Sequence, residues 1–356
     1  MRLKIRQMIK LMSVGLMSLA VLSCSKGDNQ LEYEKPMEFS GYTARSVTKA
    51  NGSFVTTTEL PTGQAFGVYV YNTGTSERFD PEQLSTYGKF MTDVAVTYNG
   101  GGAGSSANYS YSPKRYWPNT KESNRLAFFA YYPHNGAGLT KTGFGDFAFT
   151  AQTLPVNQID FMLADVVANQ MYGAAGSAHT STDVVDLKFY HMLTQIRFKG
   201  ITDAPSGATV KVNSVLLEGL FNKGTLAPDV AAASSVWTVD ETSTDDYSVT
   251  MKDIALPSTK VDPTAEAVAL ADPDQTLLLL PQTISDVSYI SITYTITTTS
   301  PARTITQTES IPLKSLLAKW ERNNQIVYVF TIGLHPIEIS ASAEDWDEGD
   351  YIIIVE

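Results

Sequence analysis

The residues that could perform nucleophilic, acid–base or metal chemistry are few and scattered. None of the histidines lies in a His-Glu-x-x-His pair, and no Gly-x-Ser-x-Gly segment is present. The histidines are His134, His179, His191 and His335. His191 follows two aromatic residues, which predicts a hydrogen-bonded histidine in the core or at a turn. The acidic pair 245–246, or the pair 344–345 together with 347–348, could offer oxygen ligands to calcium, but no defined ligand loop surrounds them. We therefore expect no catalytic residue, no cofactor and no metal site.

The single cysteine, Cys24, lies where lipid chemistry would use it. Four basic residues within the first ten precede an apolar run at 11–22, and Ser23 follows. This order is typical of a secretory signal, and a run of about a dozen residues is too short to span a bilayer. A cysteine directly after a small residue resembles the bacterial lipobox, in which the thiol is diacylated and the signal removed. We expect a signal peptide at 1–23 and a lipid on Cys24 that anchors the protein to the cell outer membrane.

Composition narrows the fold and the partners further. With one cysteine in 356 residues, no disulfide can form within the chain, and 43% hydrophobic residues must supply the stability. Residues 24–356 exceed the usual size of a single hydrophobic core, which predicts two domains. The formal net charge of −11 argues against nucleic acid as a partner, because an acidic surface repels phosphate.

Hydrophobic periodicity is mainly of the two-residue kind, carried by β-branched and aromatic side chains. Strands are predicted at 66–71, 94–98, 126–131, 144–150, 184–189, 193–198, 209–217, 247–251, 276–280, 289–297, 304–310 and 326–332. One short helix is predicted at 312–320, from a proline at its start and leucines three to four residues apart. Many strands with so little helix indicate an all-β protein built of antiparallel sandwiches.

Two segments that could bind ligands are better explained as structure. The glycine-rich stretch 99–106 lacks the Gly-Lys-Ser/Thr that a phosphate-binding loop requires, so we interpret it as a hairpin loop. Tyr116, Trp117 and the pair 131–132 could form a platform for stacking sugars. The neighbouring prolines and the alternation favour core and strand ends instead.

Several ordered segments resemble the fimbrillin family, the lipoprotein precursors of type V pili. The segments that carry the resemblance are 116–118, 126–133, 160–164, 187–193, 279–282, Trp320 and 328–330. The resemblance implies two tandem transthyretin-like antiparallel β-sandwich domains, at 46–184 and 185–356. The stretch 171–183, rich in Gly, Ala, Ser and Thr, is the expected connection.

The resemblance also implies how such a subunit assembles. In the family, an arginine-specific protease cuts after a first strand, which is then replaced by a strand from another subunit. Here the expected removable strand is 35–43, with Met37 and Phe39 on one face, within a propeptide at 24–45. Arg45 is the expected cleavage site. The alternative is that the strand is retained and Arg45 is simply exposed.

The C-terminus supplies the expected donor strand at 351–356. Tyr351, Ile353 and Val355 lie on one face of this segment, and Ile352 and Ile354 on the other. The alternative is that the segment closes its own sheet. The chain is thus expected to be a structural subunit or accessory adhesin of a cell-surface fimbria, with other fimbrial subunits, the membrane and an arginine-specific protease as partners. The competing function is a non-polymerising surface lipoprotein that binds a glycan or a host protein.

Overall fold

The computed structural model describes residues 36–43, 46–50, 53–57, 59–102, 105–118, 124–141, 143–145, 147–171, 184–333 and 337–346. Within these ranges the protein is all-β, as predicted, and contains no α-helix. The helical elements of the described residues are single 3₁₀ turns: η1 (Pro81–Gln83), η2 (Ser106–Asn108), η3 (Pro155–Asn157), η4 (Ala232–Ser234), η5 (Pro273–Gln275) and η6 (Leu313–Ser315).

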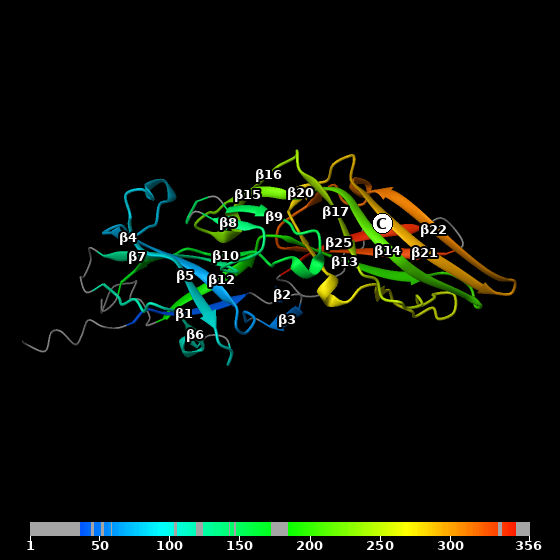
Figure 1. Cartoon of the computed structure of the whole chain (residues 1–356), viewed down its shortest axis with the longest axis horizontal. Helices are drawn as coiled ribbons and strands as arrows, with labels where there is room; N and C mark the ends of the chain where they lie inside the picture. Colours follow the sequence, from blue (N-terminus) through cyan, green and yellow to red (C-terminus); the bar gives the residue numbers. More distant parts are fainter. Residues whose placement is uncertain are drawn as a thin grey trace, which may run out of the picture.

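An eight-stranded sheet forms one end of the elongated molecule (Figure 1). Its order is β1-β12-β10-β7-β4-β5-β6, and β11 also pairs with β7. The strands are β1 (Glu38–Thr43), β4 (Ala65–Gly74), β5 (Gly88–Tyr98), β6 (Tyr109–Ser110), β7 (Arg125–Tyr132), β10 (Met162–Ala164), β11 (Val167–Gln170) and β12 (Val184–His191). The hairpin of β2 (Ser46–Ala50) and β3 (Ser53–Thr57) follows β1 in the sequence.

The other end contains two larger sheets and a two-stranded one. The first has the order β18-β13-β24-β25 with β19 on β13, the second β17-β14-β21-β22, and β20 pairs with β23. The strands are β13 (Thr194–Thr202), β14 (Ala208–Phe221), β17 (Thr244–Val249), β18 (Val268–Ala269), β19 (Leu277–Leu279), β20 (Gln282–Thr283), β21 (Tyr289–Thr299), β22 (Ala302–Pro312), β23 (Lys319–Trp320), β24 (Asn324–Ile332) and β25 (Glu338–Asp345).

A further four-stranded sheet joins the early and late parts of the chain. Its order is β16-β15-β9-β8, formed by β8 (Leu139–Lys141), β9 (Phe147–Thr150), β15 (Lys223–Ala227) and β16 (Val236–Val239). β12, in turn, pairs with the early strands β1 and β10. Strand pairing therefore crosses the expected domain limit at 184/185, and that limit remains a prediction.

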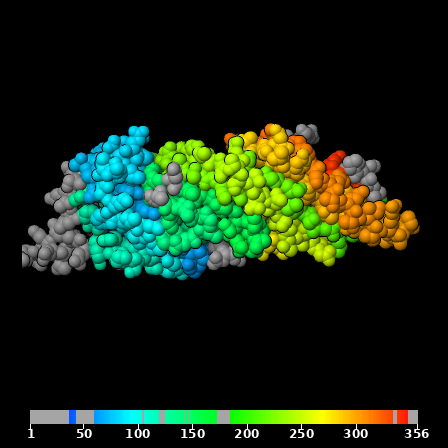
Figure 2. All heavy atoms as spheres, turned by 45° about the horizontal axis from the view of Figure 1, so that its top comes forward, coloured from blue at the N-terminus to red at the C-terminus, as the bar shows by residue number. Residues whose placement is uncertain are grey.

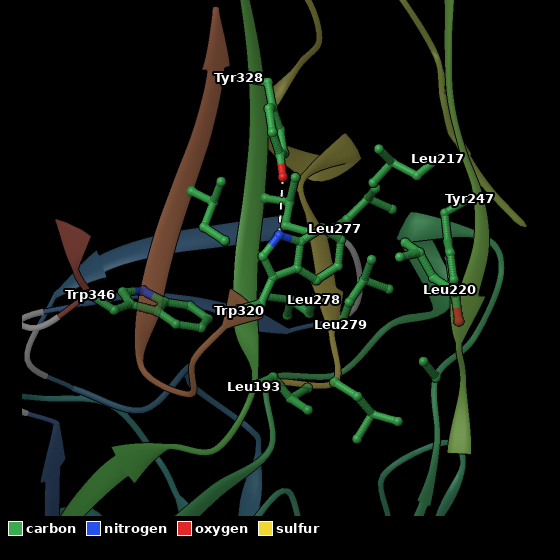
Figure 3. Packing of buried hydrophobic residues seen from close by; sticks show 14 of the residues in the cluster. Leu193, Leu217, Leu220, Tyr247, Leu277, Leu278, Leu279, Trp320, Tyr328 and Trp346 are labelled. Atoms are coloured by element: carbon green, nitrogen blue, oxygen red, sulfur yellow. Dashed lines mark hydrogen bonds between the residues drawn. The ribbon is translucent and has the colours of Figure 1, made fainter. Parts of the chain in front are cut away.

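The buried side chains form two clusters. The smaller cluster lies within the eight-stranded sheet and includes Met37 and Phe39. The larger one runs from the other face of that sheet through the second half of the chain. In its centre Trp320 is fully buried, and its Nε1 donates a hydrogen bond to the hydroxyl of Tyr328 over 3.0 Å (Figure 3). Leucines of β19 pack beside this pair. The early and late strands thus share a continuous apolar interior, which favours cooperative folding.

Two details differ from the sequence analysis. The pairs β1–β12 and β13–β24 are parallel, within sheets that were expected to be antiparallel. The predicted helix at 312–320 is wrong: this segment forms the 3₁₀ turn η6 and then β23. Nine residues are too few to sustain an α-helix in isolation, which needs ~12–15 residues. The segment is instead tied to its surroundings, because the Leu313 amide donates to the Ser288 carbonyl and Trp320 pairs with Gln282.

Candidate assembly site

The first strand occupies one edge of the eight-stranded sheet. β1 pairs in parallel with β12, from Glu38 opposite Val184 to Thr43 opposite Phe189. The side chain of Met37 just before β1 and that of Phe39 within it are 0% and 1% exposed. The expected apolar face of this segment is therefore fully buried, and we call the apolar side chains that cover it the groove.

Aromatic rings form the walls of this groove. The ring of Phe39 meets those of Tyr111 and Phe128 edge-on, with centroids 5.3 Å and 6.1 Å away. Gly41 is the next residue on the same face, and a Cβ atom there would lie 3.1 Å from the ring of Phe189. The strand therefore presents two large side chains and then a glycine, where the ring of Phe189 leaves little room for a side chain. Edge-to-face aromatic packing of this kind adds to the stabilisation from area burial.

The other side of β1 is held mainly by side chains. The hydroxyl of Tyr109 donates to the Gly41 carbonyl over 2.6 Å, and that of Tyr111 donates to the Met37 carbonyl over 2.8 Å. Backbone pairing on this side is limited, among the described residues, to the isolated bridge of Pro36 with Tyr116, where the Met37 amide donates to the Arg115 carbonyl. Burial raises the pKa of Tyr109 to about 12, so its hydroxyl remains a protonated donor at neutral pH. β1 thus has a full ladder on one side only.

Polar contacts fix the register of the strand. The hydroxyl of Ser40 is hydrogen-bonded to the carboxylate of Asp186, its partner residue on β12. The hydroxyl of Ser106 donates to the carboxylate of Glu38 over 2.5 Å. A shift of one residue would break both bonds and would turn Met37 and Phe39 away from the groove.

The far end of β12 carries a buried hydrogen-bonded contact. His191 and Asp160 are both fully buried, and Nδ1 of the imidazole lies 2.8 Å from Oδ1 of the carboxylate. The indole of Trp346 stacks on the imidazole, with ring centroids 3.8 Å apart. The sequence analysis correctly predicted a hydrogen-bonded histidine in the core. The start of the C-terminal segment is thus attached to the same strand that holds β1.

Most of the predicted site residues lie outside the described ranges. These residues are Cys24, Arg45, Tyr351, Ile352, Ile353, Ile354 and Val355. β1 ends at Thr43 and β2 begins at Ser46, so a cut after Arg45 would separate these two strands. Trp346 is the last described residue before the expected donor strand.

The other sequence candidates are structural. The glycine-rich stretch connects β5 to β6, which pair as an antiparallel hairpin, as expected. Trp117 and Tyr131 are buried in the core, whereas Tyr116 is 45% exposed. The sequence analysis missed Tyr109 and Tyr111 as contacts of β1. Their spacing of two residues was the available signal, because it places both rings on one face.

Comparisons with known proteins agree with this architecture. The sequence profile of the fimbrillin-like family matches residues 48–346. The chain is 23% identical, over 98% of its own length and 99% of the relative's, to the fimbrium subunit Fim1C of Phocaeicola vulgatus. The crystal structure of a fimbrial protein from Bacteroides vulgatus covers 87% of this chain, and 99% of that protein is matched, with a TM-score of 0.58 and 19% identity.

A candidate cell adhesion protein from Bacteroides uniformis has the same fold, with a TM-score of 0.52 and 16% identity over 87% of this chain and 98% of that protein. The chain therefore belongs to the fimbrillin-like family of fimbrial and cell adhesion proteins. Among the described residues, no helix is long and apolar enough to cross a membrane.

Proposed function

We propose that this chain is a subunit of a cell-surface fimbria, exported as a lipoprotein acylated at Cys24 and assembled by strand exchange. The observation that carries the proposal is the position of β1. It fills an apolar groove with Met37 and Phe39, yet it lies at a sheet edge with a complete ladder on one side only. Removal of a strand at the edge leaves the hydrogen-bonded pairing among the other strands of the sheet intact.

Cleavage after Arg45 starts the exchange in this proposal. The cut removes the covalent link between β1 and the rest of the chain, so the released strand is held by non-covalent contacts alone. Burial of two large apolar side chains supplies about 3 to 6 kcal/mol of that attachment. A competing strand that fills the groove equally well recovers the same free energy, because the receiving surface does not change.

The incoming strand in this proposal is the C-terminal segment of another copy. Ile352 and Ile354, or Tyr351, Ile353 and Val355, would replace Met37 and Phe39 in the groove. Each choice offers a row of apolar side chains at alternate positions, which strand addition to an open sheet edge requires. The family assignment supports assembly with other fimbrial subunits.

Digestion of the purified precursor with an arginine-specific protease tests this function. We expect a cut after Arg45, loss of the N-terminal peptide and formation of multimers. The variant Arg45→Lys keeps the charge but resists the protease, and under the same digestion it should form nothing larger than the undigested precursor does. Multimers that form equally in this variant would contradict cleavage-triggered assembly. A completely cut protein that stays soluble and forms no larger assembly would favour the non-polymerising binding protein instead.

Lipid attachment needs its own experiment. In cells, Cys24→Ala should abolish acyl labelling and retention in the outer-membrane fraction, because no other thiol is present in the chain. Cys24→Ser keeps a side chain of similar size but also lacks the thiol, so it should show the same loss. Retention of either variant with unchanged mobility would exclude this anchor.

A further inference from the structure

One long sheet edge lacks the features that usually protect such edges. β22 is the last strand in the order β17-β14-β21-β22, and no described strand pairs with its outer side. It pairs with β21 from Ala302 opposite Thr299 to Pro312 opposite Tyr289 without a register shift. Exposed edges present a row of free N–H and C=O groups, and proteins commonly protect them with lysines, prolines or bulges.

Another strand of the same length shows the contrast. β5 is also eleven residues long, and its outer side pairs with β6 only at Thr97 and Tyr98. It carries Lys89, and Asp93 has a φ of 51° near two register shifts against β4. Residues 303–311 of β22 contain no lysine, no proline and no bulge. This edge is therefore open to another strand, whereas β5 is protected.

The outward face of β22 is a row of hydroxyl groups. Each of these hydroxyls lies close to a hydroxyl on β21. The pairs are Ser291–Ser310 at 2.6 Å, Thr293–Thr308 at 2.8 Å, Thr295–Thr306 at 3.0 Å and Thr297–Thr304 at 3.4 Å. A hydroxyl both donates and accepts hydrogen bonds. The hydroxyl row of a second β22 strand, paired to the outer side of the first, could therefore extend this series of hydroxyl contacts.

Two charged residues determine which partner strand fits. Arg303 and Glu309 are the only charged residues of β22, and each is three positions from Thr306. If a second β22 lies antiparallel with Thr306 opposite Thr306, Arg303 of each copy lies opposite Glu309 of the other. Moving the centre of pairing by one residue separates both charge pairs. One register is therefore favoured by charge at both ends of the strand.

The charged groups are available for such pairing. Arg303 is exposed and makes no ion pair with another described residue. Tyr294 donates a hydrogen bond to Oε1 of Glu309 over 2.6 Å, which positions the carboxylate. Oε2 of Glu309 takes no part in that hydrogen bond. Ion pairing at the edge also offsets the repulsion between two copies that each carry a formal net charge of −11.

We propose that β22 is an interface for a second copy of this chain, joined through antiparallel pairing of two β22 strands centred on Thr306. The two copies are related by a two-fold axis, so the same edge serves both, and two four-stranded sheets become one continuous sheet. The β21–β22 hairpin projects at one end of the molecule (Figures 1 and 2), and β1 lies in the other half (Figure 1). This interface is independent of the assembly site at β1 and does not need cleavage at Arg45.

Sedimentation of the uncut full chain, combined with charge exchange, tests the proposal. The full chain should dimerise. Arg303→Glu and Glu309→Arg should each weaken the dimer about tenfold or more, because each places two pairs of like charges opposite one another. An equal mixture of the two variants should form a mixed dimer in which every pair is complementary, and the double variant should dimerise with itself. A monomeric wild-type chain at submillimolar concentration, or wild-type dimerisation by either single variant, would overturn the proposal.

A matched pair of lysine substitutions locates the interface. Thr306→Lys places two lysines together on the two-fold axis and should yield monomers. Thr297→Lys makes the same change on β21, away from the edge, and should leave the dimer intact. Equal effects of the two substitutions would overturn the proposal. Removal of residues 351–356 should also leave the dimer intact. If dimers appeared only after that removal, the chain's own C-terminal segment would be the natural occupant of this edge, and the proposal would fail.

Discussion

The indole ring of Trp346 stacks on the imidazole ring of His191, with centroids 3.8 Å apart and planes within 6° of each other. His191 ends β12, and residues 184–189 of the same strand hold β1. One strand therefore carries both the predicted removable strand and the attachment point of the predicted donor segment. A change at either end of the chain acts on the same element.

The stacked pair makes a measurable contribution to stability. Trp346→Ala removes a ring that is 6% exposed and uncovers the buried pair of His191 and Asp160. We expect a loss of about 3 to 5 kcal/mol in the free energy of unfolding, as for other buried tryptophans. Trp346→Phe keeps an aromatic ring over the imidazole and should recover part of this loss. Denaturant unfolding of both variants is the measurement, and an unchanged midpoint for Trp346→Ala would show that the stack is not stabilising.

A reversible covalent link can separate cleavage from exchange. Ser40 and Asp186 are directly paired on β1 and β12, and their side chains are in hydrogen-bond contact. Cysteines at both positions are therefore placed to form a disulfide. The oxidised Ser40→Cys/Asp186→Cys variant should be cut after Arg45 but should retain β1 and form nothing larger than the uncut chain does. Reduction should restore assembly. The control is the single variant Ser40→Cys, which cannot form this disulfide and should assemble after cleavage. Assembly by the oxidised double variant would show that β1 need not leave.

Alkaline pH should weaken the attachment of β1. The pKa of Tyr109 is raised to about 12 in the folded protein, chiefly by burial, from an ordinary value of 10.0. Its protonated form is therefore favoured by folding. The stabilisation is complete below pH 10 and is lost as the pH rises from there to about 12. Tyr109→Phe should reduce the slope of stability against pH in this range while costing a hydrogen bond at neutral pH. Melting temperatures of both proteins from pH 8 to 12 check this, and identical slopes would contradict it.

Removal of residues 351–356 distinguishes a donated strand from one that closes its own sheet. If the segment is donated, the truncated chain should keep its melting temperature, and cleavage at Arg45 should not enlarge the assembly that it forms. If the segment completes its own domain, truncation exposes a sheet edge and costs several kcal/mol of the ~5–15 that hold a domain together. Thermal unfolding and size analysis before and after digestion separate the two cases. A large loss of stability in the uncut truncated chain would exclude the donor assignment.

Local sequence patterns predicted many of the strands. They did not predict which strands, far apart in the sequence, pair with one another. Alternating residues correctly predicted β21 and β22, and the aromatic neighbours of His191 predicted its burial. The partner of that histidine, Asp160, lies 31 positions away, and Ser40 lies 146 positions from Asp186. No periodicity relates such distant residues. The joining of β15 to β9 was missed for the same reason, since short strands leave little local signal.

The central claim is that β1 is replaced during assembly. The most direct measurement is the intact mass and N-terminal sequence of the subunit isolated from native cell-surface fimbriae. The account predicts a subunit that begins at Ser46 and lacks both β1 and the acylated Cys24. Assembled fimbriae whose subunits retain residues 36–43 in one continuous chain would contradict it.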